Sequence, residues 1–160
     1  MCRAQLEKEY EGMVERHELY AKFGITAEAA QLFETELGTL VLALEGLKND
    51  WHTSPDPNTA RKVLDRIDRS TLGRTLVDLR QYITFEANLE KCFSSALKSR
   101  NLLMHGFFER HSFKIQTDAG RREMIADLKN LHEELFVAWQ AASKLTAILM
   151  AAISHRTDGQ

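Results

Sequence analysis

Residues Arg100 to His105 place three side chains that can do chemistry in one short stretch. The stretch reads Arg-Asn-Leu-Leu-Met-His and is followed directly by Gly-Phe-Phe. It combines a permanent cation, a polar amide and an imidazole that gains or loses a proton near neutral pH. Asn101 and His105 are four residues apart and share one face of a regular helix, so the amide can orient the ring.

Arg100 and His105 are five residues apart, which points them well away from each other on a regular helix. They can meet one substrate only if the helix ends or bends near His105, or if a second chain contributes. Gly106 is the residue type that ends helices. The spacing therefore predicts a composite site.

Metal-free RNA cleavage needs these residue types. A base must take the proton of the 2′-hydroxyl, an acid must protonate the leaving 5′-oxygen, and a fixed cation must stabilise the crowded phosphate. One histidine cannot act as base and acid at the same time. Two copies of His105 that face each other across a twofold axis could fill the two roles, while two Arg100 guanidiniums hold the phosphate. We therefore expect a homodimer.

The segment around the motif is locally basic. Lys98 to Arg122 contains six basic residues against two acidic ones, a local charge of +4 in a chain of net charge −2. Such a patch is typical of a surface that contacts phosphates. The RNA-contacting residues expected here are Lys98, Arg110, His111 and Lys114.

A purely structural interpretation of the motif is also open. With twelve arginines and six histidines in 160 residues, the Arg-x4-His spacing is expected roughly 0.45 times by chance. His105 could interact favourably with the dipole at a helix C-terminus, with Gly106 as the left-handed cap.

The composition predicts one compact domain in a reducing cytoplasm. A chain of 160 residues with 44% hydrophobic content and two prolines can bury one core. Cys2 and Cys92 form neither a disulfide framework nor a zinc pattern. We see no secretory segment and no run approaching the roughly 18 apolar residues of a membrane span, so no membrane is expected.

Apolar residues recur at helical spacing along most of the chain. Residues 1–24 are predicted to be an amphipathic helical arm ending near Gly24, and Thr26 to cap the helix that follows. The prolines at 55 and 57 mark a loop over residues 51–59. Helices are predicted over residues 59–69, from 72, over residues 85–105 and from Arg121.

The fold class is therefore all-α, an antiparallel bundle of four to five helices over residues 25–155. Residues 107–115 are the one stretch that could instead form a strand.

Arg-Asn-x-x-x-His followed by Gly-Phe-Phe, before a long final helix, resembles the HEPN domain (higher eukaryotes and prokaryotes nucleotide-binding). The turn Ser70-Thr71-Leu72-Gly73 and the Leu-rich helix leading to Ser99 resemble uncharacterised bacterial members, so the resemblance covers residues 27–154. It implies a homodimer whose catalytic residues are Arg100, Asn101 and His105.

The resemblance also implies a function. Many members are metal-independent endoribonucleases of toxin-antitoxin or defence systems, so RNA and a cognate antitoxin are the expected partners. Some toxins carry a modified tyrosine two positions after the histidine, where this chain has Phe107. Other members are non-catalytic, which leaves a helical module binding nucleotide, RNA or protein as the alternative.

No metal or cofactor is expected. His132-Glu133 begins the zinc protease pattern His-Glu-x-x-His, but Phe136 stands at the second ligand position. The chain also lacks the glycine-rich loops that hold nucleotide phosphates.

Overall fold

The computed structural model describes residues 3–158, except the side chains of Val14 and of residues 156–158. Within that range the protein has five α-helices, one 3-10 helix and no strand, which confirms the all-α class. The elements are α1 (Arg3–Lys48), α2 (Pro57–Asp68), α3 (Leu72–Leu79), α4 (Ala87–His111), η1 (Ser112–Gln116) and α5 (Asp118–Asp158). Cys2 lies outside the described residues.

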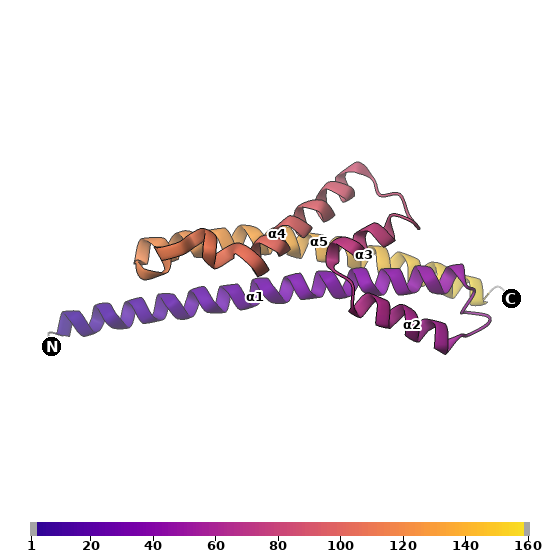
Figure 1. Ribbon diagram of the computed structural model, residues 1–160, viewed down its shortest axis with the longest axis horizontal. Coiled ribbons are helices and arrows are strands. Elements are labelled where there is room, and N and C mark those ends of the chain that lie inside the picture. The colour runs from indigo at the N-terminus through magenta and orange to yellow at the C-terminus, as the bar shows by residue number, and fades with distance from the viewer. Residues whose placement is uncertain (1–2, 159–160) are drawn as a thin grey trace.

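The two longest helices, α1 and α5, lie side by side and run in the same direction (Figure 1). Glu15 contacts Arg121 and Arg122, and further along both helices Thr26 contacts Leu128. Helix α4, which comes between α1 and α5 in the sequence, runs in the opposite direction. Because α1 and α5 are parallel, the bundle is not antiparallel throughout. The short helices α2 and α3 cover the C-terminal half of α1.

The helix expected to end near Gly24 does not end there. Helix α1 continues through it because the buried stripe of Leu19, Ala30, Phe33 and Leu37 packs against α5 on both sides of the glycine. Thr26 is therefore not a cap. It is fully buried, and its hydroxyl donates to the carbonyl of Lys22 at 2.8 Å. The division into an arm of residues 1–24 and a bundle of residues 25–155 stays a prediction.

Gly106 does not end α4 either. Leu103 and Phe107 are buried on either side of it, so core packing carries the helix on to His111. The chain turns instead at Ser112, which has a φ of 39°. Residues 107–115 are accordingly helical, and the strand considered for them is absent.

The long C-terminal helix is confirmed, and its near-heptad stripe forms much of the core. The buried members are Met124, Leu128, Leu131, Leu135, Ala138 and Ala142. The loop predicted over residues 51–59 is shorter in the structure, because α2 begins at Pro57, and Asp56 caps this helix by accepting from the backbone N–H of Thr59. Proline suits that position because its missing N–H would have no partner there.

Helix α5 has the length and composition of a membrane span over Asp118–His155. Its most apolar stretch of 18 residues has a mean hydropathy of 1.5, and 11% of that stretch is buried. The expectation that no run approaches a membrane span is therefore wrong for this helix. Length and composition alone do not establish a membrane span, and a cytoplasmic location stays a prediction.

Candidate functional site

Arg100 joins α1 to the motif on α4. Its side chain is 22% exposed, and its Nε donates to Oε1 of Glu34 on α1. Its Nη1 donates to Oδ1 of Asn101 at 3.3 Å and lies 3.3 Å from Nε2 of His105. One guanidinium therefore contacts three side chains from two helices.

The motif meets within a single chain without a helix break. The expectation that Arg100 and His105 point apart was based only on the angle between their positions around the helix axis. The arginine side chain is long enough to reach back over one turn of the regular helix. Asn101 accepts from Arg100, and it is Arg100 that contacts His105, so the orientation of the ring by Asn101 stays a prediction.

The contact with Arg100 involves the nitrogen that base catalysis would use. A guanidinium has donors and no acceptor, so a hydrogen bond between the two side chains has Nε2 of His105 as its acceptor. A nitrogen that accepts a hydrogen bond has the lone pair that a general base requires.

The three motif residues line one cavity of about 430 Å³. The opposite wall is the turn that begins α3, and the lining residues are Thr71, Leu72, Gly73, Leu97, Arg100, Asn101 and His105. Thr71 fixes this turn, because its hydroxyl caps α3 by accepting from the backbone N–H of Arg74. Asn101 and His105 are both exposed, so a ligand in the cavity can reach them.

Glu34 is the site residue that the sequence analysis missed. It lies 66 residues before Arg100 and carries the charge that opposes the guanidinium. A signal for it exists in the sequence. Glu34 follows the helical spacing of three apolar residues, Ala30, Leu37 and Val41, so it is an acid beside an apolar stripe. Arg100 is likewise a cation in an apolar stripe.

The expected RNA-contacting residues are dispersed along α4 and η1. Arg110 contacts Asp127 at 2.9 Å, and His111, which is 5% exposed, contacts the same carboxylate oxygen at 2.8 Å. Lys114 pairs with Glu123 at 2.7 Å, and this hydrogen bond holds the pKa of the glutamate below its usual value. Lys98 is exposed, and among the described contacts it alone of the four has no acidic partner.

Arg110 and His111 also lie some distance from the cavity. Ten residues of α-helix separate Arg100 from Arg110, a rise of roughly 15 Å along the axis. The structure thus brings together the three expected catalytic residues and leaves three of the four basic residues engaged with acids at the far end of α4 and in η1.

Among residues 3–158, no group of three or more His, Cys, Asp or Glu side chains is arranged to hold a metal ion. Cys92 is a free thiol whose pKa is raised, first by burial and then by the nearby Glu134. A thiol with a raised pKa is a poor nucleophile at neutral pH.

Comparison of the chain with models of known protein families, with curated proteins and with solved structures gave no match. The interpretation of the site therefore rests on its residues and their geometry.

Proposed function

We propose that this protein is a metal-independent endoribonuclease that acts as a homodimer, with Arg100, Asn101 and His105 at a composite site. One observation carries the proposal: a guanidinium in direct contact with an exposed imidazole on the wall of an open cavity. Cleaving RNA through its own 2′-hydroxyl requires this pair, because one group moves protons while the other stabilises the charge that develops on phosphate.

The roles follow from the atoms. Nε2 of His105 takes the proton of the 2′-hydroxyl, and the 2′-oxygen attacks phosphorus. The bond to the 5′-oxygen then breaks, and this oxygen takes a proton from the His105 of the second copy. Arg100 exchanges its contact with His105 for the phosphate oxygens. Asn101 holds the guanidinium on the cavity side, and Glu34 fixes it from behind.

A second copy is needed because one chain brings a single histidine to the cavity. The face of α4 that carries Asn101 and His105 also exposes two large apolar side chains, Met104 at 45% and Phe108 at 42%. Apolar side chains of this size on an open face favour burial against a partner. A homodimer packed on this face would put the two cavities next to each other.

The alternative is a helical module that binds nucleotide, RNA or a protein partner without cleaving it. The observation that favours it is the engagement of Arg100 by three side chains of its own chain, Glu34, Asn101 and His105. A toxin or defence role with a cognate antitoxin, and a place in the cytoplasm, rest on the resemblance to HEPN domains.

The test is cleavage of labelled RNA by the purified protein in EDTA, for wild type, His105→Ala and His17→Ala. His17 is an exposed histidine on α1, so it is the matched control. The proposal expects cleavage by wild type and His17→Ala and none by His105→Ala. If none of the three cleaves several RNAs while wild type binds them, the binding module is the function.

A further inference from the structure

The N-terminal part of α1 projects beyond the rest of the molecule (Figure 1). Residues 3–11 are all exposed, and among the described contacts Glu15 is the first residue of α1 to form an ion pair with α5. A helical segment of roughly 12 residues that packs on nothing is marginal in water. Contact with a partner would therefore stabilise this segment.

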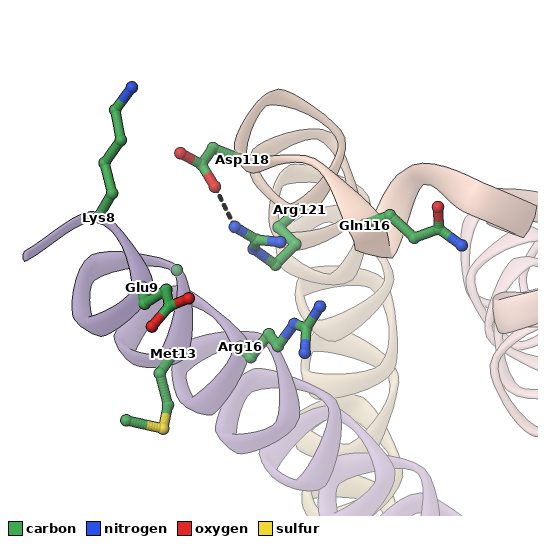
Figure 2. A pocket seen from close by; sticks show the side chains of 8 residues that line it. Lys8, Glu9, Met13, Arg16, Gln116, Asp118 and Arg121 are labelled. Carbon is green, nitrogen blue, oxygen red and sulfur yellow. Dashed lines mark hydrogen bonds and ion pairs between the residues drawn. The ribbon is translucent and has the colours of Figure 1, made fainter. Parts of the chain in front are cut away.

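One stripe of side chains runs along the side of this segment that faces away from α5. Its members are separated by four and three residues in turn, which gives the average period of about 3.5 residues of a coiled coil. They are Leu6, Tyr10, Met13, His17 and Tyr20, and we call them the α1 seam. All five are exposed, and the four other than His17 are at least half exposed. Figure 2 shows the Met13 side chain pointing away from Arg121 of α5. The seam is a largely apolar helix face that the chain itself leaves uncovered.

Two opposite charges flank the seam on one edge. Glu9 and Arg16 directly precede Tyr10 and His17, so they are seven residues apart and share that edge. Both are exposed, and neither has a charged partner among the described contacts. Charges at this position of a coiled coil select the partner and its orientation. The two charges are self-complementary, because a twofold axis can match each Glu9 with an Arg16.

We infer that the α1 seam binds the seam of a second copy of this chain as a short antiparallel coiled coil. Tyr10 lies opposite Met13 of the second copy, and the twofold axis repeats this contact. An aromatic ring against a thioether is a favourable pair. In the same register Glu9 lies beside Arg16 of the second copy, so two reciprocal ion pairs form across the interface.

The ends of the seam match in this register as well. Leu6 meets His17 of the second copy, and the guanidinium of Arg3 meets the ring of Tyr20. From Arg3 to Tyr20 the paired segment has 18 residues and a length of roughly 27 Å. Tyr20 is 14 residues from Glu34, or roughly 21 Å along α1. The interface is therefore separate from the proposed ribonuclease site.

Charge disfavours the other ways of pairing two seams. An antiparallel shift of one heptad toward the N-terminus places Glu9 against Glu9 of the second copy, and the opposite shift places Arg16 against Arg16. A parallel pair stacks His17 on His17 and puts the uncharged Ala21 of the second copy across from Arg16. The antiparallel register with Tyr10 against Met13 is thus the one in which opposite charges meet.

Charge reversal in the full-length protein, measured by sedimentation equilibrium, tests this pairing. Glu9→Arg or Arg16→Glu brings like charges together twice, so the dissociation constant of the seam should rise at least about tenfold. The double variant, Glu9→Arg with Arg16→Glu, exchanges the two charges and should restore the wild-type dissociation constant. The control variants Glu11→Arg and Arg61→Glu, at exposed positions off the seam, should associate as wild type does.

This test does not depend on the ribonuclease. Any association through the exposed face of α4 is common to all the variants, so differences between them report on the seam alone. A single reversal that leaves the dissociation constant unchanged, or a double variant as weak as the single ones, would overturn the inference.

Disulfide cross-linking tests the register. In a background of Cys2→Ser and Cys92→Ala, protein with Tyr10→Cys is mixed with protein with Met13→Cys and oxidised. We expect the mixture to form linked dimers at least about tenfold faster than either protein alone, because only the mixture places two cysteines opposite each other. Equal rates in the three samples would contradict the antiparallel register.

Discussion

Nη1 of Arg100 lies 3.3 Å from Nε2 of His105, and Nε of the same guanidinium is held by Glu34 on another helix. The cation is therefore fixed from two directions before any substrate arrives. Donors positioned in advance stabilise a transition state more than mobile ones, because they need not reorganise during the reaction. This arrangement yields predictions about each of the three residues.

Replacing Arg100 by lysine keeps the positive charge and removes the planar set of donors of the guanidinium. One ammonium cannot contact Glu34, Asn101 and His105 in the geometry of a planar guanidinium. We expect Arg100→Lys to reduce RNA cleavage by about a hundredfold or more while RNA affinity changes little. Arg61→Lys is the matched control, and single-turnover cleavage with a filter-binding assay is the measurement. A lysine variant with the wild-type rate would show that only charge matters.

Glu34 is predicted to act as a positioning residue. Glu34→Gln keeps the shape of the side chain but removes the charge that partly neutralises Arg100. RNA should bind more tightly, so KM falls, while the loosened guanidinium lowers kcat by up to about a hundredfold. Glu28→Gln, an exposed acid on α1, should change neither. If kcat and KM of Glu34→Gln both equal those of wild type, Glu34 does not position Arg100.

Gly106→Ala distinguishes a glycine inside a helix from one that ends it. Gly106 has no positive φ, and an added Cβ would meet only Leu102 Cδ1, at 3.8 Å. Alanine should therefore stabilise the protein by about 0.5–1 kcal/mol. For a chain of this length that raises the Tm by about 1–4 °C. A lowered Tm in a thermal scan would mean that α4 ends at Gly106.

Gly120→Ala is predicted to have the opposite effect. A Cβ atom on Gly120 would collide with the backbone carbonyl of Lys114, where η1 folds back onto α5. A backbone atom cannot move aside as a side chain can, so the expected loss is about 2 kcal/mol or more of unfolding free energy. Urea denaturation measures it. Wild-type stability in this variant would place η1 elsewhere.

The buried acid Glu45 should make stability depend on pH. Burial raises its pKa, but hydrogen bonds from Tyr82 and Arg66 outweigh burial and hold the pKa below the ordinary value of 4.5. A carboxyl group whose pKa is lower in the folded than in the unfolded protein adds stability. This stability is complete at pH values above the unfolded-state pKa and is lost as the pH falls through the folded-state pKa. The Tm should therefore drop as the pH is lowered below about 4.5.

Glu45→Gln is the test of that dependence. The variant should lose about 1 kcal/mol at pH 7, because the ion pair with Arg66 is gone. Its Tm should then fall less steeply than that of wild type in the acid range. Parallel curves for the two proteins would assign the acid sensitivity to other carboxylates.

Long apolar stripes were enough to predict the all-α class and the helix that became α5. Burial of Met124, Leu128 and Leu135 follows directly from their spacing. Glycine misled the prediction twice. At Gly24 and Gly106 the local preference of glycine for a helix end is outweighed by core packing on both sides of the residue. The few residues around each glycine do not reveal that packing.

The candidate site follows from the sequence only in part. Arg100, Asn101 and His105 form a recognisable motif, but their helix positions alone predict that Arg100 and His105 point apart. Glu34 is 66 residues away, and its pairing depends on how α1 packs against α4. The reach of the arginine side chain, rather than the angle between helix positions, decided that Arg100 and His105 touch.

The ends of the RNA fragments test the central claim most directly. RNA is incubated with wild-type protein in EDTA, and the product termini are identified by mass spectrometry, with His105→Ala as the blank. Attack by the 2′-hydroxyl predicts 2′,3′-cyclic phosphate and 5′-hydroxyl ends that His105→Ala does not produce. Fragments with 3′-hydroxyl and 5′-phosphate ends, or equal cleavage by His105→Ala, would contradict the account.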